Sequence, residues 1–96
     1  MRVVLGEDLT LLRDGLIRLL TAYDMDVVAA VDNGPGLLHA LVTHRPDVAV
    51  VDVRLPPGFT DEGLKAAIEA RAQVPGLPVL AGGADLPQLL IRLQRR

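Results

Sequence analysis

The feature that most constrains the fold of this chain is a rhythm of four short apolar runs, each followed by a segment with helical spacing. The runs are rich in valine and leucine and cover residues 2–6, 26–31, 47–52 and 77–82. Strands that are apolar throughout and alternate with amphipathic helices are typical of a parallel sheet covered by helices on both faces. We therefore expect one α/β domain, residues 1–96, built from about four strand–helix units.

The spacing of apolar residues also predicts which helical side chains face the sheet. In the first helical segment Arg13, Asp14 and Arg18 fall on the outer face, and the inward set is Leu9, Leu12, Leu16, Leu19, Leu20 and Tyr23. In the second segment, which ends before Pro46, the inward set is Leu37, Leu38, Leu41 and Val42. In the third, with Thr60 as its N-cap, it is Leu64, Ala67 and Ile68. A fourth helix is predicted from Asp85, with Leu86, Leu89, Leu90 and Leu93 inward.

Several classes of function are disfavoured by composition. The chain has no cysteine, which excludes disulfides and thiolate metal sites, and no apolar stretch approaches the ~18 residues that span a bilayer. Its net charge is -2 and its basic residues concentrate only in the terminal RLQRR, so direct nucleic-acid binding is not expected. The opening MRVVLGED reaches acidic residues too early for a secretory signal, so we expect a soluble cytoplasmic protein without membrane contact.

Three carboxylates occupy the ends of predicted strands. Glu7 and Asp8 follow the first strand, and Asp52 ends the third. In open parallel sheets ligands bind at the carboxyl ends of the strands, so if these two strands are adjacent the three carboxylates share one pocket. An all-oxygen set suits Mg²⁺, and the ion would let Asp52 stay ionised to attack a phosphoryl group. Taken singly, each acid has a plainer interpretation as a cap of a helix or loop.

The segments VVLGEDLTLLRDGL and RPDVAVVDVRLPPGFTDEGL resemble the receiver domain of bacterial response regulators, in the class that usually carries a helix-turn-helix output. The resemblance implies a flavodoxin-like parallel sheet with the first and third strands side by side. It also implies that Glu7 and Asp8 hold Mg²⁺ together with Asp52, that a histidine kinase phosphorylates Asp52, and that Pro56 matches a proline of the family motif.

The same resemblance marks what this sequence lacks. The family has a serine or threonine at the end of the fourth strand, where Gly82 or Gly83 stands here, and a lysine at the end of a fifth strand, whereas no lysine follows Lys65. A fifth strand is not recognisable after Gly83. We therefore expect an atypical receiver, truncated at its C-terminus, in which phosphorylation is slow.

Without a fifth strand, the apolar fourth strand would be a sheet edge, and exposed apolar edges favour pairing. We therefore expect a homo-oligomer formed through the fourth strand and the terminal helix. The resemblance implies that Arg54 lies at the pocket mouth, where it would tune access or pair with Glu7; the alternative is a loop cation without such a role. Arg54 also stands where a Mg²⁺-dependent phosphatase would need a second acid, which argues against an enzyme. The alternative to a phosphorylated receiver is a phosphorylation-independent interaction module that binds a histidine kinase or another response regulator.

Overall fold

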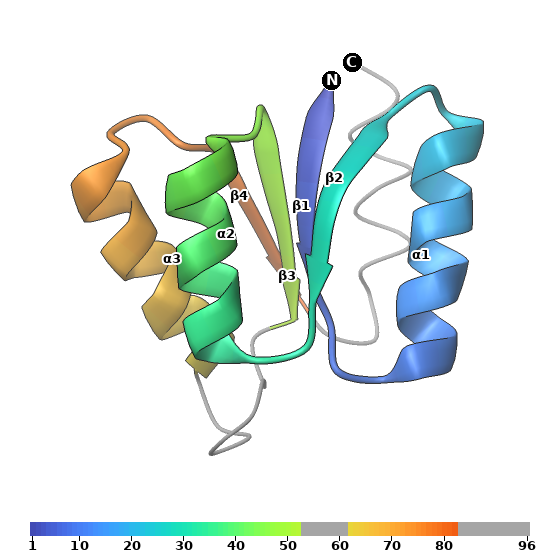
Figure 1. The fold of residues 1–96 in the computed structure, drawn as a ribbon, viewed down its shortest axis with the longest axis horizontal. Helices are drawn as coiled ribbons and strands as arrows, with labels where there is room; N and C mark the ends of the chain where they lie inside the picture. Colours follow the sequence, from blue (N-terminus) through green and yellow to red (C-terminus); the bar gives the residue numbers. More distant parts are fainter. Residues whose placement is uncertain (53–61, 83–96) are drawn as a thin grey trace.

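The computed structural model describes residues 1–52 and 62–82, which form a sheet with helices packed on both of its faces (Figure 1). The elements are β1 (Arg2–Gly6), α1 (Thr10–Ala22), β2 (Asp26–Val31), α2 (Gly34–His44), β3 (Val48–Asp52), α3 (Glu62–Gln73) and β4 (Val79–Gly82). Every strand pair is parallel, and the spatial order is β2-β1-β3-β4. The predicted parallel α/β fold and the adjacency of the first and third strands are therefore confirmed, and the order is that of a flavodoxin-like sheet. The predicted N-cap Thr60, the fourth helix from Asp85 and the question of a fifth strand lie outside the described residues.

The strand bounds agree closely with the apolar runs. β1 and β2 have the predicted bounds, β3 starts at Val48 in place of residue 47, and β4 starts at Val79 in place of residue 77. Asp47, directly before β3, bonds to Arg2 of β1: its carboxylate Oδ2 accepts the Arg2 main-chain N–H at 2.6 Å, while its own N–H donates to the Arg2 carbonyl at 2.8 Å. This contact fixes the start of β3 beside the start of β1.

The core consists of two apolar layers, one on each face of the sheet. Alternate residues of β1 and β3 point to opposite faces, as the period of a strand requires. The layer under α1 contains Val3, Leu5, Leu16, Leu20, Val48 and Val50. The layer under α2 and α3 contains Val4, Leu37, Ala40, Leu41, Ala49, Val51, Ala66, Ala70 and Leu77. The central strands are thus buried on both sides, which explains why their sequences are apolar throughout.

The face of α1 that packs on the sheet is shorter than predicted, at both ends of the helix. Leu16 and Leu20 are buried, and Leu12 and Leu19 pack against the same layer. Leu9 and Tyr23, however, are 59% and 49% exposed. These two predictions were wrong because both residues lie just outside the helix, at its N-cap and C-cap, where helical periodicity no longer sets the direction of a side chain.

The inward face of α3 also differs from the prediction. Ala67 is buried as expected, but Ile68 is 61% exposed. Among the side chains of α3 that the structure describes, the buried ones are small residues at i, i+3, i+4 and i+7, namely Gly63, Ala66, Ala67 and Ala70. The side chain of Leu64, which was also predicted to face inward, lies outside the described residues. Ile68 lies outside the stripe of glycine and alanine, whose small residues allow helix and sheet to approach closely.

The ends of α2 follow the sequence signals well. Asn33 is the N-cap, with its side-chain Oδ1 accepting the Gly36 N–H at 2.7 Å, and proline occupies the first turn. The helix ends at His44, one residue before Arg45, which adopts a left-handed conformation with φ 44° and donates its N–H to the Leu41 carbonyl. Among the described helices, none combines the length and apolar character needed to cross a membrane.

Candidate functional site

The carboxyl edge of the sheet brings the ends of β2, β1 and β3 into one row. Gly6 of β1 is level with Val31 of β2 on one side and with Val51 of β3 on the other. The next residue, Glu7, donates its main-chain N–H to the Val31 carbonyl at 2.9 Å. The register therefore places the main chain of Glu7 beside that of Asp52, as the adjacency argument required.

The two acids after β1 have different surroundings. The Glu7 side chain is only 1% exposed, and its Oε2 accepts the Asp8 main-chain N–H at 3.0 Å. Asp8 is half-buried. A buried carboxylate that accepts a hydrogen bond from the next residue is held in one orientation, whereas Asp8 keeps access to solvent. The pair thus offers one fixed and one accessible carboxylate.

Arg13 is an additional member of this site that the sequence analysis assigned to the outer face of α1. It is half-buried, and its Nη1 donates to the Glu7 carbonyl oxygen at 3.1 Å. The residue directly follows the inward-facing Leu12, so its long side chain can lie along the helix boundary and reach back over the loop. The position of Arg13 at the border of the apolar stripe was the one sequence feature that indicated such a contact.

The structure describes the backbone of Asp52 and not its side chain. It is the last residue of β3 and is level with Gly82, the last residue of β4. Its side chain, together with Arg54, Pro56 and Gly83, lies outside the described residues. The roles predicted for these residues therefore stay predictions, while the strand end at which Asp52 stands and its neighbour Gly82 are as the sequence indicated.

The residues present fit a magnesium ion by the chemistry of their donors. Glu7, Asp8 and Asp52 supply only carboxylate oxygens, the ligands that hard divalent cations prefer. Among the side chains that the structure describes, no three acidic or histidine residues gather closely enough to hold an ion. Glu7 and Asp8 supply two of the three expected ligands, so the set depends on Asp52.

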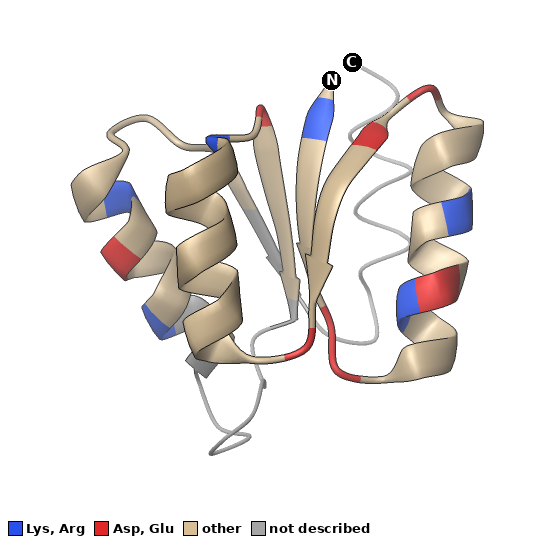
Figure 2. Cartoon of the chain, in the orientation of Figure 1, with Lys and Arg blue, Asp and Glu red and all other residues tan. Residues whose placement is uncertain are grey.

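The distribution of charge also favours the carboxyl edge of the sheet as the candidate site. The loops that leave the carboxyl ends of β1 and β2 are both acidic, and they lie side by side at the lower edge of the sheet in Figure 2. The second loop contributes Asp32, whose Oδ1 accepts from the Asn33 side-chain amide at 2.8 Å. Clustered negative charge at this edge favours a cation as its ligand.

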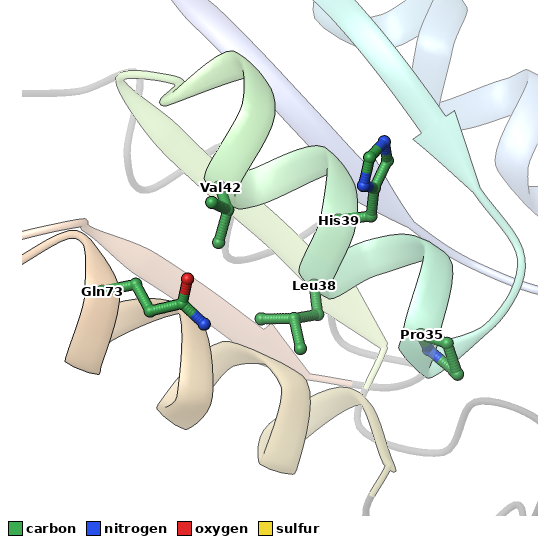
Figure 3. A pocket seen from close by; sticks show the side chains of 5 residues that line it. All are labelled: Pro35, Leu38, His39, Val42 and Gln73. Atoms are coloured by element: carbon green, nitrogen blue, oxygen red, sulfur yellow. The ribbon is translucent and has the colours of Figure 1, made fainter.

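A separate pocket lies between α2 and α3, away from the acidic residues. It has a volume of about 330 Å³ and is lined by Pro35, Leu38, His39, Val42 and Gln73. Leu38 and Val42 point toward α3, while the imidazole of His39 projects away from it (Figure 3). The lining is mainly apolar and carries few polar groups that could orient a substrate, so the acidic edge remains the candidate site.

Comparisons with known proteins agree on one family. The family model for the response regulator receiver domain matches residues 3–87. The probable transcriptional regulatory protein NarL of Mycobacterium tuberculosis strain ATCC 25618 / H37Rv is 33% identical over 90 residues, which is 93% of this chain and 41% of that protein. The oxygen regulatory protein NreC of Staphylococcus epidermidis strain ATCC 12228 / FDA PCI 1200 is 32% identical over 81 residues, covering 83% of this chain and 36% of that protein.

A solved structure gives the same result. The signal receiver domain of the putative response regulator NarL from Mycobacterium tuberculosis superposes with a TM-score of 0.70 at 30% identity, covering 95% of this chain and 75% of that one. The present chain spans roughly two fifths of the length of the curated relatives that it matches, 41% and 36% in the two cases above.

Proposed function

Since the chain belongs to the response regulator receiver domain family, and so to two-component signalling, we propose that Asp52 accepts a phosphoryl group from a histidine kinase, with Mg²⁺ bound by Glu7, Asp8 and Asp52. The observation that carries the proposal is the register of the sheet. Gly6 is level with Val51, so the acidic pair after β1 and the carboxylate that ends β3 come from neighbouring positions on one edge. A ligand at the strand ends of a parallel sheet would meet all three acids.

The reaction needs little from the protein beyond a nucleophile and a means of stabilising charge. A carboxylate oxygen of Asp52 forms a bond to phosphorus while the phosphorus–nitrogen bond of a phosphohistidine breaks. The imidazole nitrogen of the kinase keeps the electron pair of that bond and takes a proton from solvent. Bound Mg²⁺ would supply charge neutralisation at the phosphoryl oxygens. Glu7 and Asp8 would fix the ion beside Asp52, and neither residue exchanges a proton.

Two exposed leucines beside these acids offer a docking surface for the donor protein. Leu9 follows Asp8 directly and is 59% exposed, and Leu11 in the first turn of α1 is 89% exposed. Large apolar residues that stay exposed next to a polar site are typical of surfaces that bind another protein. We infer that the kinase contacts this start of α1 while its phosphohistidine reaches Asp52.

The sequence also argues that the transfer is slow. Gly82 and Gly83 stand where the family has a serine or threonine hydroxyl. Each missing stabilising contact of this kind raises a barrier by about 3 kcal/mol, since removing one donor to a developing oxyanion typically costs a factor of ~10²–10³ in rate. Phosphorylation of this chain would accordingly be slower than in a receiver that has the hydroxyl.

The test uses a small phosphodonor in place of the kinase. The protein is incubated with acetyl phosphate and Mg²⁺, and its intact mass is compared with that of an Asp52→Asn variant treated in parallel. We expect one phosphoryl group on the parent and none on the variant, with the parent's gain lost when Mg²⁺ is chelated. Equal labelling of parent and variant, or no labelling of either over many hours, would contradict the proposal.

A second candidate function, interaction with a partner independently of phosphorylation, is favoured by the position of β4. In the described part of the sheet β4 pairs only with β3, and its sequence VLAG is apolar throughout. Such an edge is suited to pairing with a second copy of this chain. Light scattering across a concentration series tests this idea, and a monodisperse monomer at high concentration would refute it.

A further inference from the structure

We propose that Arg13 is a positioning residue that sets the affinity of the acidic edge for a divalent cation, by holding the loop that carries Glu7 and Asp8. The inference rests on the proposed function, because it assumes that these carboxylates bind the ion. It assigns to this site a residue that contributes no oxygen ligand of its own.

The contacts of Arg13 span the whole loop between β1 and α1. Its main-chain N–H donates to the carbonyl of Leu9, at the end of the loop, at 2.8 Å. Its side-chain Nη1 donates to the carbonyl of Glu7, at the start of the loop, at 3.1 Å. The first of these is the ordinary i→i−4 bond at the start of α1, which any residue other than proline would make at this position. The side-chain bond is the contact that depends on arginine, and it reaches back over a three-residue connection that contains both acids.

The rest of the loop shows why such a contact matters. The N-cap of α1 is Leu9, which makes no capping hydrogen bond through its side chain. Neither Thr10 nor its neighbours in the first turn add an acidic group that would favour the helix start. The Glu7 N–H is bound by the Val31 carbonyl, so the bond from Arg13 fixes the carbonyl on the other side of the same residue. The peptide groups before and after Glu7 are therefore both held by hydrogen bonds. This orients the Asp8 N–H and the Glu7 carboxylate that accepts from it.

Two physical effects of Arg13 on cation binding have opposite signs, which makes the proposal testable. As a positive charge near the site, the guanidinium repels a cation, and its removal would tighten binding. As a group that orients the ligands, it favours binding, and its removal would weaken it. Residues that orient metal ligands typically change affinity by about 10–100-fold when replaced. Repulsion across a half-exposed position is screened by water and salt, so we infer that orientation dominates.

The experiment titrates MgCl₂ into the isotopically labelled protein and follows the amide signals of the β1–α1 loop by NMR. The variants are Arg13→Gln and Arg13→Lys. The matched control is Arg18→Gln, because Arg18 is an exposed residue of the same helix and its replacement changes the net charge equally. An Asp8→Asn variant reports whether the shifts reflect binding at the acids. The dispersion of the same spectra shows that each variant is folded.

We expect the Kd for Mg²⁺ to rise about tenfold in Arg13→Gln, to recover in large part in Arg13→Lys, and to stay unchanged in Arg18→Gln. The ratio of variant to parent should persist when the salt concentration is raised from about 0.1 M to about 1 M, where the screening length falls from about 10 Å to about 3 Å. Three outcomes would overturn the inference while leaving the proposed function intact. The Mg²⁺ affinity of Arg13→Gln could equal that of the parent, or it could be tighter than the parent's only at low salt. The affinity that Arg13→Gln loses could also fail to return in Arg13→Lys. A parent protein whose loop signals do not respond to Mg²⁺, or respond equally in Asp8→Asn, would overturn both.

Discussion

Replacing Leu16 by alanine should cost the domain about 3 kcal/mol, whereas the same replacement at Leu11 should cost almost nothing. Both residues lie on α1, but Leu16 is 2% exposed and Leu11 is 89% exposed. Leu16→Ala removes three carbons from the layer shared with β1 and β3, worth about 0.8 kcal/mol each, and leaves a cavity that raises the total within the observed range of about 2–5 kcal/mol. Leu11→Ala removes little contact, and alanine has a slightly higher helix propensity, so we expect a change within about 0.5 kcal/mol.

The assay is urea unfolding followed by circular dichroism, which suits a chain with no tryptophan. A domain of 96 residues has a stability of about 5–14 kcal/mol, so a loss of 3 kcal/mol is a large and measurable fraction. In thermal scans the Leu16 variant should melt roughly 12–24 °C below the parent, at about 4–8 °C per kcal/mol. The reasoning would be refuted if Leu11→Ala lost more than about 1 kcal/mol or if the two variants were equally stable.

Three further substitutions test the described backbone by the same unfolding assay. Gly15→Ala should stabilise the protein by about 0.5–1 kcal/mol, because the added methyl group meets nothing within 4 Å and glycine is unfavourable inside a helix. Gly76→Ala should destabilise it by about 1 kcal/mol, because φ is +81° there and alanine resists that conformation; a neutral result would contradict the assigned turn. Asn33→Ala should cost about 1 kcal/mol through loss of the 2.7 Å bond to the Gly36 N–H, and Asn33→Ser should retain most of that stability. Equal losses in the two Asn33 variants would exclude capping as the cause.

The positions of the strands were largely predictable from the sequence, because the central strands are buried on both faces. The adjacency of the first and third strands was implied by the resemblance to receiver domains, and the register of the strand pairs was not predicted. Val4 and Val50 point to opposite layers of the core. Because both layers are apolar, successive residues of these strands are all apolar, and polar and apolar residues do not alternate. The place of Asp52 at a strand end followed from the same runs. β3 starts one residue later than predicted, after Asp47, whose side chain accepts the Arg2 N–H in a contact that no apolar pattern indicates.

The helix faces were predicted less well, for two different reasons. Leu9 and Tyr23 were placed on the core because they continue the spacing of α1, but the helix spans only Thr10–Ala22. Ile68 was placed inward by helical spacing, while the described buried side chains of α3 are those of alanine. A pattern of apolar residues gives the period of a helix, but the choice of face also depends on how closely the neighbouring elements approach.

The candidate site was predictable in its carboxylates and not in its supporting contacts. Glu7 and Asp8 stand out because charged residues directly follow a buried strand. The sequence does not predict the bond from Arg13 to the Glu7 carbonyl in the same way. This bond joins a side chain to the main chain six residues earlier, so it depends on the path of the loop. The side-chain roles of Asp52 and Arg54 stay predictions that phosphorylation and binding measurements can test.

The central position of β1 has a consequence for how this domain is made. β1 is synthesised before the other strands that the structure describes, yet it is hydrogen-bonded on one side to β2 and on the other to β3. Its second partner ends at Asp52, so both edges of β1 are paired only after roughly half of the 96 residues have been synthesised. Long-range parallel pairing of this kind slows folding and leaves an apolar segment in need of protection during translation. The nascent chain, more than the finished domain, is therefore the form most exposed to aggregation.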